Sequence, residues 1–267
     1  MKNLYLSSSI KDILKYLVQD ILKNDLMHLK LGTCENKKPY ILGVTGSVAV
    51  GKSTMSHKLK LGLQNYFTKK NVSVVTTDSF LFSNEILSSL GLMKHKGFPD
   101  TYDIRKLIDF FLKIQSGISN IVIPVYSHFF QNVVLNSNKM IENSDIFIIE
   151  GLHILNPSFY MTKKRNSFLL SKFFNCSIYI DADDLFLKEW YLSRFLYLRK
   201  MSKFYPDSFF NFYYKMSLND AINVASKTWY EVNYKNLKKN IFLTQEYADF
   251  IVIKDFNHDI NCIKIVN

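Results

Sequence analysis

Cysteine, arginine, proline and long apolar runs are all scarce in this chain of 267 residues. Its cysteines, Cys34, Cys176 and Cys262, lie far apart and form no Cys-x-x-Cys pair, so neither a disulfide framework nor a zinc site is expected. No apolar run approaches the roughly 18 residues of a membrane span, and the N-terminus lacks the apolar core and cleavage site of a signal peptide. We therefore expect a cytoplasmic protein without membrane contact.

Arginine is scarce even though the formal net charge is +11. Of the 34 basic residues four are arginines, and the lysines are scattered among Asn, Ile and Phe rather than gathered into a stripe. This distribution is typical of a coding bias toward A and T, and it argues against a basic surface selected for nucleic acid. We expect no nucleic-acid partner.

The nine glycines and five prolines are spread along the chain without a linker-like cluster, so one domain over residues 1–267 is expected. Strand-like apolar runs and helical segments follow one another, which indicates an α/β fold with a mostly parallel central sheet flanked by helices. Residues 1–38 are expected to add an amphipathic helix. Residues 218–237 predict an amphipathic helix with Ala221, Val224, Ala225 and Trp229 on one face, mostly in the core, and ADFIVIKD and NCIKIV predict a small antiparallel edge or a pair of strands flanking the sheet.

Two of the few glycines stand close together in GSVAVGKST, residues 46–54. A glycine, four residues, and then Gly51, Lys52 and Ser53 match the P-loop pattern, between a strand-like run and a helical one. There the loop N–H groups bind phosphates, Lys52 reaches the β- and γ-phosphates, and Ser53 ligates Mg²⁺. A chance match in a Gly/Ser turn is the alternative. The expected nucleotide-binding residues are Gly46, Ser47, Val48, Ala49, Val50, Gly51, Lys52, Ser53 and Thr54.

Two further apolar runs end in carboxylates. The run VSVVTTD ends at Asp78, 26 residues beyond Lys52, and SDIFIIEG places Glu150 at the end of another run. Because the carboxyl ends of parallel strands face the ligand crevice, Asp78 would accept a proton from an attacking hydroxyl or hold the water shell of the metal. An N-cap on the next segment is the alternative for Asp78. Glu150 is placed like a Walker-B acid, as a metal residue or as a partner of metal-bound water or of Lys52.

Three more segments carry candidate substrate residues. NIVIPVYSH, residues 120–128, is a strand-like run that we expect to deliver His128 to the same sheet edge, although a lone histidine is as often structural. The helical run from about Asp184 carries Arg194, which would stabilise charge on a transferred phosphoryl group or pair with nearby acids. The aromatic stretch FYPDSFFNFYYKM, residues 204–216, walls a substrate pocket or fills the core.

An ordered series of stretches resembles the bacterial type I pantothenate kinases. The stretches are GVTGSVAVGKST, VVTTDSFLF, GLMKHKGFPDTYD, IPVYSH, DIFIIEGLHIL, SIYIDA, WYLSRFLYLR and WYEVNYKNLKKNI, and they begin at about residue 40. The resemblance implies a P-loop kinase fold, a homodimer, and phosphorylation of the terminal hydroxyl of pantothenate by ATP with Mg²⁺. It implies that Lys52 serves ATP and that Asp78 is the base, with Arg194 near the transferring phosphate. It also implies that pantothenate is held by His128, Tyr191, Arg194 and Asn233.

Several residues depart from the pattern of this family. Ser79 replaces a glycine, which would strain a position of positive φ. Gln131 and Asn132 replace a Tyr-Asp pair. His57 stands where the family has an arginine that helps to hold coenzyme A, so we expect weakened feedback inhibition by coenzyme A. Another small-molecule P-loop kinase, of the uridine or phosphoribulose type, and a catalytically silent nucleotide-binding protein are the alternatives.

Overall fold

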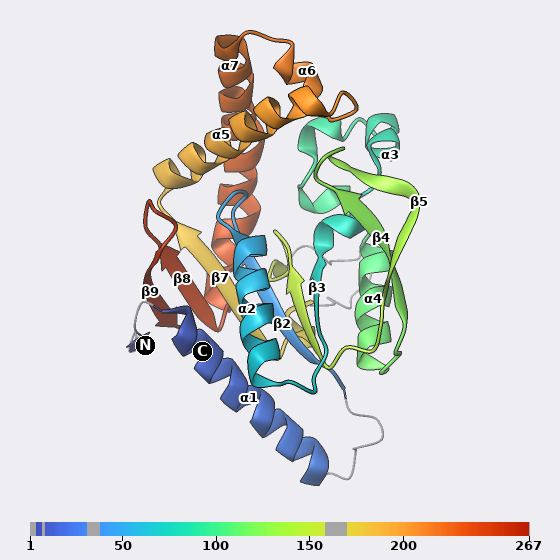
Figure 1. The fold of residues 1–267 in the computed structure, drawn as a ribbon, viewed down its shortest axis with the longest axis vertical. Coiled ribbons are helices and arrows are strands. Elements are labelled where there is room, and N and C mark those ends of the chain that lie inside the picture. Colours follow the sequence, from blue (N-terminus) through green and yellow to red (C-terminus); the bar gives the residue numbers. More distant parts are fainter. Residues whose placement is uncertain (1–3, 7–8, 31–37, 158–169, 267) are drawn as a thin grey trace.

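The chain folds into an α/β structure around one seven-stranded sheet (Figure 1). The computed structural model describes residues 4–6, 9–30, 38–157 and 170–266. The strand order is β1-β9-β8-β7-β2-β6-β3, and β9 alone among these strands runs antiparallel to its neighbours β8 and β1, so the mostly parallel sheet is confirmed. Its strands are β1 (Leu4–Leu6), β2 (Tyr40–Gly46), β3 (Val72–Thr76), β6 (Ile146–Glu150), β7 (Cys176–Ala182), β8 (Phe250–Lys254) and β9 (Ile260–Ile265).

Helices cover this sheet because its central strands are apolar on both faces. Every residue of β2 and of β6 is buried, as expected for parallel strands between two layers of helices. In Figure 1, α2 lies in front of the sheet, and α5, α6 and α7 lie together above it. The helices are α1 (Ile10–Lys30), α2 (Lys52–Tyr66), α3 (Asn84–Ser89), α4 (Ile104–Gln115), α5 (Asp184–Met201), α6 (Asn211–Tyr214) and α7 (Leu218–Thr228). Across the described ranges, no helix combines the length and the apolar character needed to cross a membrane.

The predicted N-terminal helix is present as α1. It buries Ile13, Leu17, Val18 and Ile21, which lie on one face at helical spacing. Before it, β1 pairs antiparallel with β9 and completes that edge of the sheet. The N-terminal segment therefore packs onto the same core as the rest of the fold.

The strand predicted over residues 120–128 is present, but it does not belong to the central sheet. β4 (Ile121–Ser127) instead pairs antiparallel with β5 (Asn132–Ile141) in a separate two-stranded ribbon. Pro124 lies within β4, and the pairing register shifts between Pro124 and Tyr126. Proline has no N–H for a ladder, so it is found at edges and bulges rather than in central strands. The ribbon stands beside α4 in Figure 1.

The C-terminal part follows the prediction with one exception. α5 begins at Asp184, and β8 with β9 forms the antiparallel edge. α7 continues into π-helical turns over Trp229–Tyr234 and Leu237–Ile241. It buries Ala221, Ala225 and Trp229, whereas Val224 is 36% exposed, so the predicted burial of Val224 is wrong. At about 100° per residue, Val224 lies roughly a quarter turn from the middle of the buried face.

Two further expectations concern Ser79 and the aromatic stretch at residues 204–216. Ser79 lies in the 3₁₀ turn Thr77–Phe80, and the described non-glycine residues with positive φ are Ala49, Gln131, Asn136 and His258. The predicted strain at Ser79 is therefore absent, because this turn uses ordinary right-handed backbone. In the aromatic stretch Phe210 is buried while Phe204 and Phe212 are exposed, so the stretch fills the core only in part, and its role as the wall of a substrate pocket stays a prediction.

Candidate active site

The P-loop joins the buried end of β2 to α2, and its shape requires glycine at both ends. Gly46 has a φ of +137°, and a Cβ there would collide with the carbonyl oxygen of Ile180. Gly51 has a φ of +93° and forms the N-cap of α2. Residues with a Cβ rarely adopt these conformations. The loop therefore wraps closely around the end of β2, with the N-terminus of α2 at its far side.

Lys52 is the first residue of α2, and its side chain lies over the loop. Its Nζ donates to the carbonyl oxygens of Gly46 at 3.2 Å and of Ser47 at 2.8 Å. The N-cap residue Gly51 provides no capping side chain, so within the described part of the chain the first N–H groups of α2 are available to an anion. Burial lowers the pKa of Lys52 to about 8, against the charges of Asp78 and Glu150, which raise it.

Ser53 and Glu150 meet at the same place from different elements. Ser53 Oγ donates to Glu150 Oε1 at 2.8 Å. Glu150 is 7% exposed, and its Oε2 has no hydrogen-bond partner within the described part of the chain. A hydroxyl beside a buried, unpartnered carboxylate oxygen is a set of hard donors that fits Mg²⁺, which proteins bind through one or two carboxylates together with substrate phosphates. The two predicted metal residues are therefore adjacent.

Asp78 lies in the 3₁₀ turn that follows β3, close to the cations of the site. Its backbone N–H donates to Thr76 Oγ1 at 3.3 Å, and Ser83 provides the N-cap of α3, so the capping alternative for the Asp78 carboxylate is not observed. The charge of Asp78 raises the pKa of Lys52 and of Lys96, in each case against the larger effect of burial. The carboxylate thus lies close enough to both ammonium groups to act on their protonation.

Lys96 is a site residue that sequence reasoning missed. Its Nζ donates to Asn84 Oδ1 at 2.6 Å and to the carbonyl oxygen of Gln131, and it lies 5.5 Å from the centroid of the Tyr126 ring. Burial lowers the pKa of Lys96 to about 8. In the stretch KHKGFPD no pattern separates Lys96 from the exposed Lys94 two residues earlier. Lys96 reaches the site only because the loop that carries it folds close to Asp78, and this fold depends on tertiary contacts.

His128 reaches the site from the end of β4. Its ring packs edge to face on Tyr126, with centroids 5.2 Å apart. Although the residue is exposed, desolvation of the ring lowers the pKa of His128, while the charge of Asp78 raises it and that of Arg194 lowers it. The histidine therefore lies within the electrostatic reach of both the carboxylate and the guanidinium.

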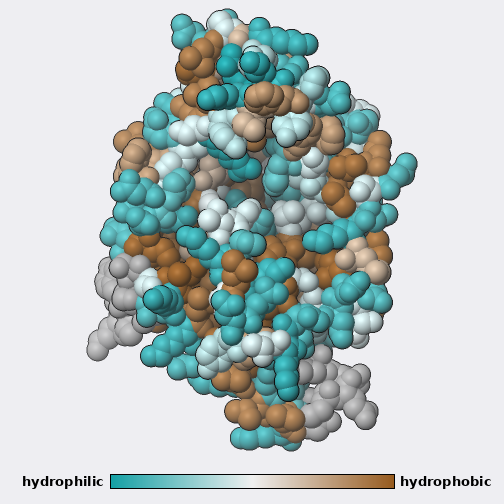
Figure 2. Space-filling model, viewed as in Figure 1, coloured by the Kyte–Doolittle hydropathy of each residue, from teal (hydrophilic) through white to brown (hydrophobic). Residues whose placement is uncertain are grey.

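Tyr191, Arg194 and Asn233 form the opposite wall. The Tyr191 ring lies 5.5 Å from that of Trp229, and burial raises the pKa of Tyr191 to about 12, against its hydrogen bond with Asn233. Arg194 is exposed on α5 and makes no hydrogen bond or ion pair with any described residue. The alternative that it pairs with nearby acids is therefore not observed. Figure 2 shows the surface hollowed between the helices α5–α7 at the top and the body of the molecule.

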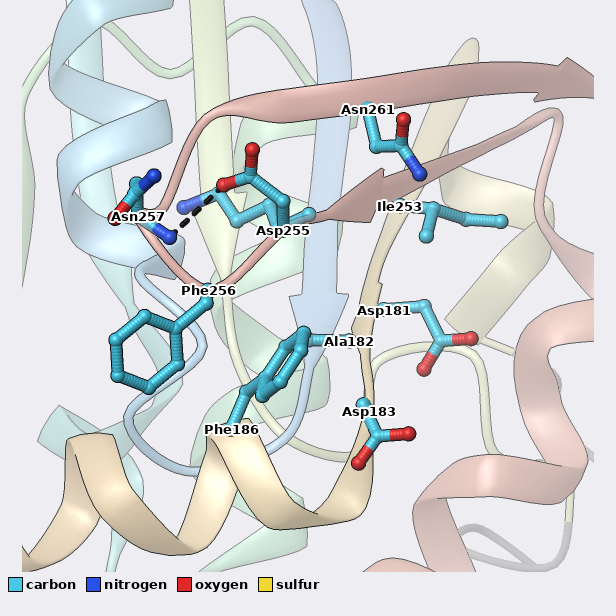
Figure 3. A pocket seen from close by; sticks show the side chains of 10 residues that line it. Asp181, Ala182, Asp183, Phe186, Ile253, Asp255, Phe256, Asn257 and Asn261 are labelled. Atoms are coloured by element: carbon cyan, nitrogen blue, oxygen red, sulfur yellow. Dashed lines mark hydrogen bonds between the residues drawn. The ribbon is translucent and has the colours of Figure 1, made fainter.

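A second hollow, of about 620 Å³, lies at the ends of β7 and β8 (Figure 3). Phe186 and Phe256 pack edge to face on one side of it, with centroids 5.5 Å apart, and the carboxylates of Asp181 and Asp183 lie on another. Lys254 also lines it and donates from Nζ to the carbonyl oxygen of Val50 at 3.0 Å, so the hollow adjoins the P-loop. Lys254 was missed, although its place at the end of a parallel strand is a signal that could have found it.

The fold and this site together define a P-loop kinase, with a phosphate loop and a carboxylate that faces the loop lysine. The model of the Phosphoribulokinase / Uridine kinase family matches residues 41–197. A pantothenate kinase from Photorhabdus laumondii is 41% identical over 94% of this chain and 79% of its own length, and one from Cronobacter sakazakii is 38% identical over the same shares. The D-glycerate 3-kinase from Cryptococcus neoformans shares the fold, with a TM-score of 0.63 at 14% identity over 95% of this chain and 99% of that one.

The chain therefore belongs to the Phosphoribulokinase / Uridine kinase family and, among its relatives, to the pantothenate kinases.

Proposed function

We propose that this protein transfers the γ-phosphoryl group of ATP to the terminal hydroxyl of pantothenate, the first step of coenzyme A biosynthesis. The pantothenate kinases at 38% and 41% identity support this substrate. The observation that carries the chemistry is the place of Asp78, whose charge raises the pKa of both Lys52 and His128. A carboxylate between the loop lysine and a substrate-facing histidine is placed to accept a proton from an attacking hydroxyl.

In this proposal, residues 46–54 bind ATP. The N–H groups of the loop and of the first turn of α2 donate to phosphate oxygens, and Lys52 exchanges its bonds to the loop carbonyls for bonds to the β- and γ-phosphates. Ser53 and Glu150 would hold Mg²⁺, because their oxygens are adjacent and one carboxylate oxygen is unpartnered within the described residues. An ion held there would supply positive charge to offset the charge of the phosphates.

Asp78 then acts on the substrate hydroxyl. It accepts the hydroxyl proton while the hydroxyl oxygen bonds to the γ-phosphorus, and the bond from that phosphorus to the bridging oxygen of ADP breaks. Arg194 has no partner in the described residues and would face the charge on the transferring group. His128, Tyr191 and Asn233 would hold pantothenate between the two walls of the site.

The expectations about regulation and assembly form part of the same proposal. His57 is exposed on α2, and its weaker charge relative to arginine would weaken binding of the phosphates of coenzyme A as an inhibitor. The family resemblance supports a homodimer. The composition supports a cytoplasmic location without nucleic-acid or membrane partners.

Product analysis separates the proposal from its alternatives. The purified chain is incubated with ATP and Mg²⁺ and, in turn, with pantothenate, uridine and ribulose 5-phosphate, and the products are identified by mass spectrometry. Of the three substrates, we expect only pantothenate to give a phosphorylated product. Phosphorylation of uridine or ribulose 5-phosphate instead would identify another small-molecule kinase. ATP binding without turnover of any of the three would identify a silent nucleotide-binding protein.

A further inference from the structure

The turn between β4 and β5 touches the segment that follows α5. The carbonyl oxygen of Phe129 accepts hydrogen bonds from the backbone N–H of Phe209 at 3.2 Å and from Ser208 Oγ at 3.3 Å. The rings of Phe129 and Tyr205 pack edge to face, with centroids 5.2 Å apart. We call these contacts, made by Phe129, Tyr205, Ser208 and Phe209, the clasp. In Figure 1 the clasp lies where the segment between α5 and α6 passes the tip of the ribbon.

The segment that carries Ser208 is fixed to the wall formed by α5. Asn211 Nδ2 donates to the carbonyl oxygen of Ser202, next to the end of α5, at 3.0 Å, whereas Ser202 Oγ donates back to the carbonyl oxygen of Arg199 within its own turn, at 2.7 Å. The guanidinium of Arg199 donates to the carbonyl oxygens of Tyr213 at 2.9 Å and Met216 at 2.7 Å. Since α5 also carries Tyr191 and Arg194, the clasp joins the ribbon to the opposite wall of the candidate site.

The other end of the turn is held by residues beside Asp78. Gln131, at a φ of +48°, donates from Nε2 to the carbonyl oxygen of His128 at 2.7 Å, and its own carbonyl oxygen accepts from Lys96. Asn132 Oδ1 accepts from the backbone N–H of Asn84 at 2.9 Å. Gln131 and Asn132, which depart from the family pattern, therefore fasten the turn on this side. The clasp fastens it on the other side.

A two-stranded ribbon needs such support. Isolated two-stranded ribbons are marginally stable in water, so the position of the turn depends on contacts outside the ribbon. His128 is the residue before Phe129, and the clasp holds the carbonyl of Phe129. Ser208 is 7% exposed, and its Oγ both donates to that carbonyl and accepts from the N–H of Phe210 at 3.3 Å. Because this buried hydroxyl both donates and accepts a hydrogen bond, it fixes the backbone at Phe129 against the backbone at Phe210.

We propose that Ser208 is a positioning residue for His128, and that the clasp sets the distance between the two walls that hold the substrate. The inference rests on the proposed function, because it gives His128 a role in binding pantothenate. Ser208 itself does not touch the reacting atoms. Loss of the clasp should therefore weaken pantothenate binding and leave ATP binding at the P-loop unchanged.

Matched serine variants test the proposal in the full chain. Ser208→Ala removes the hydroxyl of the clasp, whereas Ser202→Ala removes a buried hydroxyl near the start of the same segment that donates to Arg199 rather than to the turn. We expect Ser208→Ala to raise the KM for pantothenate about 5- to 10-fold, with little change in the KM for ATP, and Ser202→Ala to raise neither. Tyr205→Leu removes the exposed ring of the clasp and should act in the same direction if Ser208→Ala does not fold.

Hydrogen exchange supplies a readout that does not depend on turnover. The N–H of Phe209 donates across the clasp, so its exchange should be faster in Ser208→Ala and unchanged in Ser202→Ala. Equal effects of the two variants on the pantothenate KM, or faster exchange without any change in that KM, would overturn the inference alone. A folded parent chain that does not phosphorylate pantothenate would overturn the proposed function and this inference with it.

Discussion

ATP binding should take up a proton near pH 8.5, because burial lowers the pKa of free Lys52 to about 8. Phosphates favour the charged ammonium, so in the complex the pKa should return toward the ordinary lysine value of about 10.4. At pH 8.5 about three quarters of free Lys52 is neutral, and binding should take up about 0.75 proton. The contribution of the charged Lys52 to ATP binding is complete below pH 8 and is lost as the pH rises toward the pKa of the complex. The Kd for ATP should therefore rise about 10-fold between pH 7 and pH 9.

Calorimetry in two buffers of different ionisation enthalpy measures this proton uptake directly. The phosphate groups of ATP do not contribute, because their last pKa lies near 6. Lys52→Arg is the matched control, since its guanidinium keeps the charge and does not titrate in this range. It should bind ATP with little pH dependence and without proton uptake.

Lys96 is the second lysine whose pKa is lowered to about 8, so Lys96→Arg is tested beside Lys52→Arg. The parent uptake should persist in Lys96→Arg. Uptake close to zero at pH 8.5 in the parent chain would refute the reasoning about Lys52. Proton uptake that survives in Lys52→Arg and disappears in Lys96→Arg would show that Lys96, and not Lys52, takes up the proton.

Three further predictions concern the metal, the inhibitor and the loop. Glu150→Gln should lower kcat at least about 100-fold and raise the Mg²⁺ concentration needed for half-maximal rate, which a magnesium titration measures; an unchanged requirement would contradict the metal role. His57→Arg should tighten inhibition by coenzyme A about 10-fold, and equal inhibition of parent and variant would remove His57 as the cause. Gly46→Ala should lower the free energy of unfolding by at least about 2 kcal/mol, because its Cβ meets the Ile180 carbonyl at a positive φ; a chemical denaturation curve that superimposes on the parent curve would exclude this.

Much of the sheet and of its phosphate site was predictable because one rule connects them. Parallel strands bury both faces and end at a common edge, so the apolar runs before Gly46, Asp78 and Glu150 showed where these residues meet. The hydrogen bond of 2.8 Å between Ser53 and Glu150 agrees with that placement. The assignment of Val224 to the core failed because helical periodicity leaves residues at the border of the buried face undecided.

The ribbon could not be predicted in the same way. β4 reads as an apolar strand, and its partner β5 contains Asn, Ser and Lys, so periodicity did not reveal the pairing. The sequence therefore did not show that His128 is carried by a separate ribbon. The structure nevertheless places this residue near Asp78. Lys96 lies in a loop whose path depends on tertiary contacts with Asn84 and Gln131. Sequence patterns carry no information on such contacts.

The most direct test compares ADP release by the parent chain and by Asp78→Asn, with ATP and Mg²⁺, in the presence and absence of pantothenate. The asparagine keeps the size of the side chain and cannot accept the proton as a carboxylate does. We predict pantothenate-dependent turnover in the parent chain and a loss of at least about 1,000-fold in the variant, with the Kd for ATP retained. Turnover in Asp78→Asn close to that of the parent would contradict the assignment of the base, and a folded, ATP-binding parent without pantothenate-dependent turnover would contradict the proposed function.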